Sequence, residues 1–416
     1  MANDLTDSRK RKQYPISEII FGALFMNIFK EGSRNAFNND LREDVFKENI
    51  FKYFGMNLPH GDATDDVLRV LPPKELDEVK AELASKLIEQ KAFRNFRFLG
   101  KYYLVAVDAT GLQVFDKRHC EHCLTKTSKN GVVSYFHYVL EAKLVTRAGH
   151  AISLATEFIE NDPSRGFDKQ DCEQKAFVRL SKKIKKDFPR LPVCILADGL
   201  YPNNTVFDIC DKHNWKFIIT LKDGNLKSFQ EETILLKGTA HRQSVFRADK
   251  TSETTLRYAY LNDIEYSGRH FSWVECRQTV VKLEEKKTEE KKFVYITNVR
   301  QEPKNNVETA DSGRIRWKIE NEGFNTQKNG GYRLEHKFSR TSYPAMQNYY
   351  ILLQIAHMIN QLVERTGEVA ELMTEHSKQT LVDLWKKLIA YLVMVQVDDS
   401  NWTKPQDASA LPYQPG

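Results

Sequence analysis

The spacing of apolar residues divides the chain into helix-forming and strand-forming regions. Over residues 16–29 and 76–90, apolar side chains recur every three or four positions, which predicts amphipathic helices. The second of these patterns begins after the segment LPPKEL, whose prolines favour the start of a helix. We therefore expect residues 1–100 to form a helical N-terminal region.

Beyond residue 100 the helical spacing gives way to short apolar runs that are rich in β-branched residues, and such runs predict strands. The runs cover residues 102–108, 135–146, 151–159, 193–198 and 216–221. Helical patterns over 169–187 and 203–214 separate the later runs. Three successive strands followed by strands that alternate with helices predict a mixed α/β sheet with helical cover over 101–222.

A third region, residues 223–305, lacks a helical pattern and reads as a series of short strands, so we expect a β-rich insertion there. The charged segment EEKKTEEKK (284–292) predicts a solvated hairpin tip within it. Helical patterns return near residue 313 and continue to about 396. We assign 306–345 to the core begun at 101–222, 346–400 to C-terminal helices, and 401–416 to a disordered tail.

Composition and charge restrict the class of protein. The 416 residues are 41% hydrophobic and 28% charged, as in soluble globular proteins, and the formal net charge of +6 suits a polyanionic partner without requiring one. The N-terminus lacks the apolar core of a secretory signal, and the longest apolar stretches (349–359 and 388–397) are too short to span a bilayer. Six cysteines without framework spacing suggest a reducing compartment. We expect a cytoplasmic protein without a membrane partner.

Three acidic residues follow recognisable local patterns. Asp108 and Asp198 each end an apolar run, in LVAVDAT and VCILADGLY, and Glu320 lies in the helical segment RWKIENEGFN. Carboxylates at two strand ends and on a later helix are the oxygen ligands that a site for two Mg²⁺ or Mn²⁺ ions needs. Each aspartate alone also fits a turn or a helix cap, and Glu320 alone fits a surface ion pair with Arg316, four residues earlier.

The strand order strengthens the metal-site interpretation. The ribonuclease-H-like fold is built from three successive strands followed by strands that alternate with helices, and it carries one acid on its first strand and another on its fourth. Asp108 and Asp198 fall at those two positions. Glu322 competes with Glu320 for the third position, but Glu320 shares a helix face with Arg316.

The segment RWKIENEGFNTQKNGGYRLEH (316–336) resembles the third-acid helix of the DDE transposases of bacterial insertion sequences, in the group with a β-rich insertion and a Tyr-Arg-Glu-Lys helix signature. The similarity continues through VAVDATGLQ, ILADGLYPN and AMQNYYILLQIAHMINQL, and so covers most of residues 100–365. The resemblance implies catalytic metal ligands at Asp108, Asp198 and Glu320, with Arg316 holding a transposon-end phosphate. The family's tyrosine is replaced by Gly313, and its lysine by Gln327 with Lys328 adjacent.

Further residues near these motifs are candidates for DNA contact. Tyr201 and Trp317 lie close in sequence to the second and third acids and can stack on an unpaired base, although aromatic residues more often belong to the core. Arg333 and Lys337 follow the third-acid helix and can contact phosphates, or simply face solvent. Lys328 is the candidate for the role of the family's lysine. The helical region 1–100 is a candidate for binding the DNA end.

The segment HCEHC (119–123) contains a Cys-x2-Cys pair with two histidines, which are plausible zinc ligands. His137 can add a ligand across a hairpin. No second, well-spaced half of a four-ligand site is present, so the sequence favours free thiols in a loop.

Taken with the resemblance, the sequence predicts an enzyme that cleaves and joins double-stranded DNA at the ends of an insertion sequence. A metal-activated water would cut the element's end, and the freed 3′-hydroxyl would attack target DNA. The resemblance also implies a homodimer on paired ends. A nuclease on the same fold that does not join strands, and a catalytically inactive DNA-binding descendant of a transposase, are the alternatives.

Overall fold

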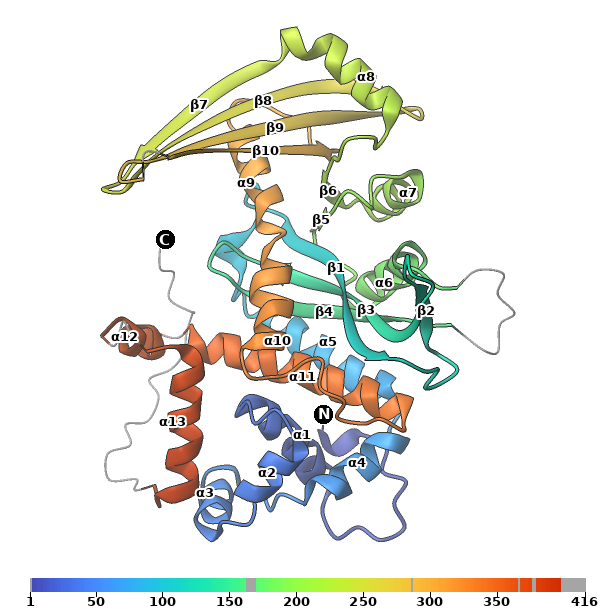
Figure 1. Ribbon diagram of the computed structural model, residues 1–416, viewed down its shortest axis with the longest axis vertical. Coiled ribbons are helices and arrows are strands. Elements are labelled where there is room, and N and C mark those ends of the chain that lie inside the picture. Colours follow the sequence, from blue (N-terminus) through green and yellow to red (C-terminus); the bar gives the residue numbers. More distant parts are fainter. Residues whose placement is uncertain (1, 162–169, 286, 366, 376–378, 398–416) are drawn as a thin grey trace.

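A ten-stranded mixed sheet forms the centre of the molecule (Figure 1). The computed structural model describes residues 2–161, 170–285, 287–365, 367–375 and 379–397. The strands are β1 (Tyr103–Phe115), β2 (Leu124–Thr127), β3 (Val133–Val145), β4 (Ala151–Ile159), β5 (Val193–Ala197), β6 (Lys216–Thr220), β7 (His241–Ala248), β8 (Ser252–Tyr266), β9 (Arg269–Lys282) and β10 (Lys287–Thr297). Their order across the sheet is β2-β3-β1-β5-β6-β10-β9-β8-β7, and β4 also pairs with β3.

Helices surround this sheet and form both ends of the described chain (Figure 1). The α-helices are α1 (Ile16–Ile28), α2 (Arg34–Asp40), α3 (Asp44–Phe54), α4 (Gly61–Val70), α5 (Pro73–Glu89), α6 (Glu173–Asp187), α7 (Asn204–His213), α8 (Lys227–Leu236), α9 (Asn306–Ile315), α10 (Thr326–Asn329), α11 (Tyr343–Glu364), α12 (Gly367–Glu375) and α13 (Leu381–Met394). Short 3₁₀ turns are η1 (Ala2–Asp4), η2 (Arg94–Phe96) and η3 (Lys237–Thr239), and η4 (Ile319–Asn325) is a π-helical segment.

The two faces of the sheet bury different sets of side chains, because neighbouring residues on a strand point to opposite faces. On β1, Val105 and Val107 belong to a core that contains residues of α5, α6 and α7. Leu104 and Ala106 belong to a second core, which includes Ile315 at the end of α9 and residues of η4. The continuous apolar runs on β1 and β5 are therefore explained by helices on both faces.

The β-rich region is continuous with the rest of the sheet. β10 pairs antiparallel with β6, with Ile296 opposite Ile219, so β7 to β10 extend the same sheet at its far edge. The hairpin expected in this region joins β9 to β10, but its tip is shorter than predicted, because residues 287–292 of the charged segment belong to β10. The expectation that residues 223–305 lack a helix is wrong, because α8 precedes the strands. The exposed Ile234 and Leu235 weaken the apolar periodicity of α8.

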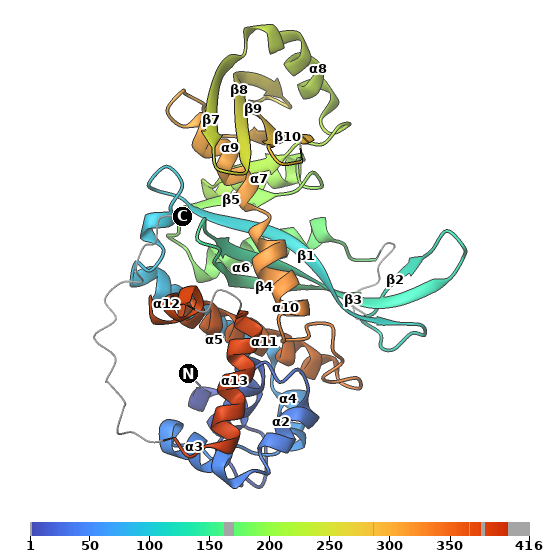
Figure 2. The same cartoon turned by 60° about the vertical axis from the view of Figure 1, so that its left-hand side comes forward.

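The two helical ends pack on each other at the opposite pole of the molecule from the β-rich region (Figure 2). Phe25 and Met26 of α1 share a core with Leu352 and Ile355 of α11, and Trp385 of α13 completes it. The sequence predicted helices over α1 and α5, and the structure adds α2, α3 and α4 between them. No helix among the described residues is long and apolar enough to cross a membrane. The expected tail, 401–416, lies outside the described residues.

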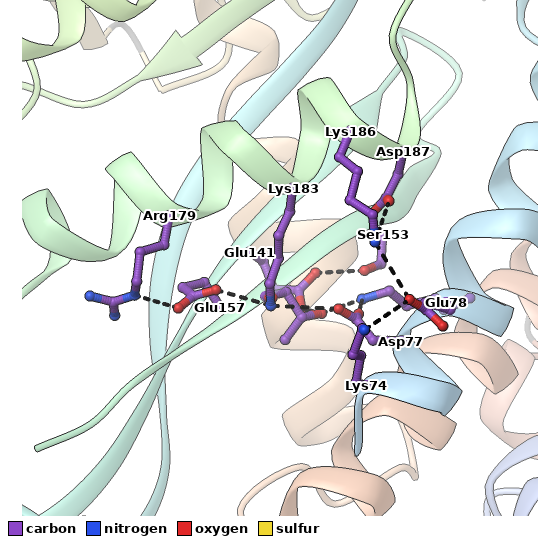
Figure 3. Close-up of polar contacts among 12 residues, drawn as sticks. Lys74, Asp77, Glu78, Glu141, Ser153, Glu157, Arg179, Lys183, Lys186 and Asp187 are labelled. Carbon is purple, nitrogen blue, oxygen red and sulfur yellow. Dashed lines mark hydrogen bonds and ion pairs between the residues drawn. The ribbon is translucent and has the colours of Figure 1, made fainter. Parts of the chain in front are cut away.

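Ion pairs fasten α5 to α6 and to the sheet (Figure 3). Asp77 of α5 lies 2.8 Å from the Lys80 ammonium and 3.6 Å from that of Lys183 on α6. Lys183 also pairs with Glu157 of β4 at 3.0 Å. Lys80 is fully buried and donates to Thr156, which in turn donates to Glu141 of β3. The N-terminal helical region is thus joined to the sheet by charge as well as by apolar contact.

The pKa of Asp77 reflects this environment. Burial alone would raise it, but the ammonium groups of Lys80 and Lys183 hold the pKa below its ordinary value of 3.8. The stabilisation by the ionised carboxylate is therefore present above pH 3.8 and is lost as the pH falls through the lower pKa of the folded protein.

We predict that Asp77→Asn lowers the free energy of unfolding by about 3 kcal/mol at neutral pH, because it leaves the buried Lys80 charge uncompensated. Glu78→Gln is the matched control on the same helix, since Glu78 forms only exposed pairs with Lys74 and Lys186. Glu78→Gln should lower the free energy of unfolding by less than about 1 kcal/mol. Urea unfolding of both variants makes the comparison, and equal losses would contradict a dominant role for Asp77.

Candidate active site

The pairing of β1 with β5 aligns the first two acids. The strands are parallel, and Ala106 lies opposite Leu196. Asp108 lies two residues further along β1, and Asp198 lies two residues past Leu196, directly after the end of β5. Adjacent strands are about 4.8 Å apart, so the backbones at these positions are close. The predicted strand-end positions are therefore adjacent, although β1 continues beyond Asp108 to Phe115.

Arg316 connects the first and third acids. Its Nη1 lies 2.7 Å from Glu320 Oε1 and 3.5 Å from Asp108 Oδ2. The arginine is 8% exposed, so this guanidinium is largely enclosed by protein and holds the two carboxylates on one side of the sheet. The ion pair with Glu320, which the sequence offered as the alternative to a metal ligand, is present, and Asp108 joins it; the predicted contact of Arg316 with a DNA phosphate stays a prediction.

The environment of Asp108 disfavours its ionised form. Burial raises its pKa to about 7; Arg316 opposes this rise and the neighbouring Glu320 adds to it. Between the ordinary value of 3.8 and about 7, the folded protein therefore binds a proton that the unfolded chain has released. The contribution of Asp108 to stability consequently falls as the pH rises through this window. At neutral pH, ionising Asp108 therefore costs more free energy in the folded protein than in the unfolded chain.

Asp198 has a different partner. Its Oδ2 lies 2.7 Å from Lys222 Nζ, and its Oδ1 accepts a hydrogen bond from the Leu200 amide at 2.8 Å. Lys222 follows β6, and its side chain passes over Gly199, where an added Cβ would lie 2.5 Å from Lys222 Cγ. The glycine after the second acid thus leaves room for the lysine that neutralises it.

The three acids do not converge on one point. Among the described residues, the group of three or more potential metal ligands with donor atoms within 4.8 Å of one another is Cys120, Cys123 and His137. Asp108 and Glu320 are linked through Arg316, whereas Asp198 is held by Lys222. Asp108 and Glu320 thus share Arg316 as a cationic partner, and Asp198 has Lys222.

A further acid adjoins the site. Glu173, at the start of α6, accepts a hydrogen bond from the Tyr201 hydroxyl at 3.3 Å. Burial raises the pKa of Glu173, and the charge of Asp198 adds to the rise. Sequence reasoning missed Glu173, because an acidic residue in the first turn of a helix is common and gives no sign of a distant partner.

The helix that carries the third acid approaches the sheet at Gly313. A Cβ added there would lie 2.6 Å from ring atoms of Tyr295 on β10, so a side chain at this position would push the helix away. The chain then changes from α9 to the π-helical η4, which contains Glu320. Such wider turns occur most often at functional sites. Gly313, where the resembled family has tyrosine, is here a point of close packing.

Gln327 and Lys328 have partners other than the three acids. Gln327 is fully buried and donates to Gln354 at 2.8 Å. Lys328 pairs with Glu335 at 2.8 Å. The residue at the position of the resembled family's lysine, Gln327, is therefore part of the core, and the adjacent Lys328 forms an ion pair outside the acidic site.

The alternative third acid, Glu322, faces elsewhere. Its Oε1 lies 2.7 Å from Lys318 Nζ, one helical turn earlier. Glu320 is the one of the two that lies with Arg316 and Asp108. The geometry thus agrees with the preference for Glu320.

The two aromatic candidates for DNA contact differ in exposure. Tyr201 is 1% exposed and packs edge-on against Phe177, so the proposed stacking on a base is wrong for this arrangement, and Tyr201 is a core residue. Trp317 is 52% exposed, beside Arg316, and keeps a free surface.

The basic candidates beyond the helix lie at or near the surface. Arg333 is exposed and has a left-handed backbone conformation (φ 51°), and its side chain lies against Gly32. Lys337 is half-buried, with its ammonium 4.5 Å from the centre of the Phe115 ring. Neither residue contacts the three acids in the described interactions.

Comparison with known proteins gives no match: no protein-family model matches this chain, and no curated protein matches it.

We predict that Gly313→Ala lowers the free energy of unfolding by about 1–3 kcal/mol, because the added methyl group meets the Tyr295 ring. Gly323→Ala is the matched control in the same run of helix. Its added Cβ would make only an ordinary contact, 3.5 Å from Lys143 Cδ, and alanine favours helix, so stability should hold or rise slightly.

Thermal and urea unfolding of both variants measure the difference. In a Tyr295→Leu background the cost of Gly313→Ala should shrink, as the clash depends on the ring. An unchanged cost in that background would show that the close approach at Gly313 is not limited by Tyr295.

Proposed function

We propose that this chain is a DDE transposase that cleaves and joins double-stranded DNA at the ends of an insertion sequence. One observation carries the proposal. Asp108 lies on β1, Asp198 directly follows the neighbouring parallel strand β5, and Arg316 holds the Glu320 carboxylate next to Asp108. The first and third acids, which are 212 residues apart in the chain, are thus brought together, and the second follows the adjacent strand.

The strand order supports a ribonuclease-H-like core. The strands β4, β3 and β1 are antiparallel neighbours, and β5 and β6 continue the sheet in parallel with β1. The first acid, Asp108, lies on β1, and the second, Asp198, directly follows its parallel neighbour β5. The β-rich segment lies between the second and third acids along the chain, as in the resembled group.

The donor set suits Mg²⁺ or Mn²⁺. Asp108, Asp198 and Glu320 offer carboxylate oxygens, which these hard cations prefer, and two ions are expected. Burial raises the pKa of Asp108 to about 7 against the opposing charge of Arg316, and a bound divalent cation would favour its ionised form. When bound, the ions supply Lewis-acid stabilisation of the reacting phosphate and lower the pKa of water.

The protein residues around the acids have separate roles in this proposal. Arg316, which is buried, orients Glu320 toward Asp108. Lys222 has a 60% exposed side chain and can exchange Asp198 for a DNA phosphate. The exposed Trp317 offers a ring on which an unpaired base can stack.

The proposed reaction consists of two in-line displacements at phosphorus. In the first, water attacks the phosphodiester at the element's end, and the 3′-oxygen leaves as a hydroxyl. In the second, this hydroxyl attacks a target phosphodiester, so one DNA bond forms as another breaks. Neither step forms a covalent bond to the protein. The protein would act as a homodimer on paired ends.

The proposal expects inverted repeats on both sides of the coding sequence, and these would be the test DNA. We predict that purified protein with Mg²⁺ cuts a labelled duplex carrying such a repeat and joins its 3′-end to plasmid DNA. Asp108→Asn, Asp198→Asn and Glu320→Gln should each lower the rate by roughly 10³-fold or more, because each removes an ion ligand worth several kcal/mol to the transition state.

Glu322→Gln is the matched control, since it lies two residues from Glu320 and pairs with Lys318 instead. It should keep activity close to wild type. Activity lost in Glu322→Gln and kept in Glu320→Gln would reverse the choice of third acid. Cleavage without joining would identify a nuclease, and DNA binding without cleavage in any divalent ion would identify an inactive relative.

A further inference from the structure

A second cluster of potential metal ligands lies away from the three acids, where the loop between β1 and β2 meets β3. Cys120 and Cys123 of this loop face His137, which lies on β3. The distance between the two Sγ atoms is 3.5 Å. His137 Nε2 lies 3.5 Å from Cys120 Sγ and 3.7 Å from Cys123 Sγ.

These distances match the edges of a zinc coordination tetrahedron. Zn–S bonds of about 2.3 Å and Zn–N bonds of about 2.0 Å give S–S edges of about 3.8 Å and S–N edges of about 3.5 Å. A disulfide would instead need sulfur atoms about 2.0 Å apart. One ion at the centre of the triangle can therefore reach all three donors with little movement of the protein.

The surroundings hold the three donors in place. Cys123 is 1% exposed and His137 is 3% exposed, and Asn161 donates to the Cys123 carbonyl at 3.1 Å, which ties the loop to the end of β4. The rings of Phe115 and Tyr343 flank the His137 imidazole. A cysteine pair in a mobile surface loop would have no such enclosure.

The two other histidines of the loop are engaged elsewhere. His119 stacks on Phe115 and its Nε2 contacts the Arg340 carbonyl. His122 stacks on Tyr343, with ring centres 4.2 Å apart. Neither histidine belongs to the group of donor atoms that lie within 4.8 Å of one another, so Cys120, Cys123 and His137 supply three of the four positions of a tetrahedral ion.

We propose that Cys120, Cys123 and His137 bind one Zn²⁺ ion, which fastens the β1–β2 loop to β3. Binding converts two thiols to thiolates and releases two protons, and the neutral imidazole donates through Nε2. Thiolate and imidazole ligands favour zinc over Mg²⁺ and Mn²⁺, so this site is chemically distinct from the carboxylates. The sequence allowed His137 as a ligand across a hairpin but favoured free thiols, because it contains no second, well-spaced half of a four-ligand site; in the structure His137 lies against both cysteines.

The site also has a structural consequence. The loop it fastens contacts Arg340, in the segment that precedes α11, and Tyr343, the first residue of α11. Lys337 of the preceding segment lies over Phe115 at the end of β1. Bound zinc would therefore fix the loop and this basic segment together. The zinc site needs only the geometry of Cys120, Cys123 and His137 and is independent of the proposed enzymatic activity.

The test measures zinc in reduced, tag-free protein by elemental mass spectrometry and then follows Co²⁺ uptake by absorption. The wild type should hold one metal ion per chain and, with Co²⁺, give thiolate-to-cobalt charge-transfer bands. Cys120→Ser, Cys123→Ser and His137→Gln should lower zinc affinity by at least about 100-fold, as each removes a direct ligand. Cys172→Ser, at an exposed cysteine outside the cluster, is the matched control and should bind as the wild type does.

Limited trypsin digestion adds a readout that does not depend on the variants folding equally well. Lys117 and Arg118 are exposed in the loop, and a zinc chelator should speed cleavage after them severalfold in the wild type and in Cys172→Ser. In Cys120→Ser the chelator should change nothing. A wild type that holds no zinc and shows no cobalt–thiolate bands would overturn the proposal, as would unchanged zinc affinity in both Cys120→Ser and Cys123→Ser.

Discussion

The parallel pairing of β1 with β5 is the constraint on which the rest of the candidate active site depends. Because Ala106 lies opposite Leu196, the two aspartates that follow are level with each other. A shift of one residue would turn one of them to the opposite face of the sheet. Helices on both faces fix this register, since the alternating side chains of β1 enter two different cores. The third acid then reaches Asp108 only because α9 approaches β10 closely at Gly313.

Gathering these acids has an electrostatic cost that the protein limits but does not remove. Arg316 and Lys222 neutralise part of the charge, yet the pKa of Asp108 still rises to about 7. The acidic cluster is therefore a local source of instability that packing elsewhere must offset. The charged network around Asp77 is of the opposite kind, because its carboxylates and ammonium groups are interleaved and the pKa of Asp77 falls. Burial alone would raise the pKa of either aspartate; the ammonium groups of Lys80 and Lys183 outweigh it at Asp77, whereas Arg316 does not outweigh it at Asp108.

The sequence predicted local features well and long-range contacts poorly. Apolar runs located β4, β5 and β6 within a residue or two, and the two aspartates were found because each ends or interrupts such a run. The helix α8 was missed because its exposed leucines hide the periodicity, and the π-helical turn could not be read from spacing that assumes a regular helix. Tyr201 looked like a DNA-facing residue beside Asp198, but only the packing of α6 shows that it is core. Contacts such as Cys123 with His137 depend on strand register, which no local pattern reports.

The central claim is that Asp108, Asp198 and Glu320 together bind a divalent cation, and Mn²⁺-dependent thermal unfolding without DNA tests it most directly. At a Mn²⁺ concentration 100 times the dissociation constant, binding should stabilise the wild type by about 2.7 kcal/mol and raise its unfolding midpoint. The same rise should appear in Glu322→Gln and be lost in Asp108→Asn, Asp198→Asn and Glu320→Gln. If the unfolding midpoint of Asp108→Asn, Asp198→Asn and Glu320→Gln rose with Mn²⁺ as much as that of the wild type, the claim would be contradicted.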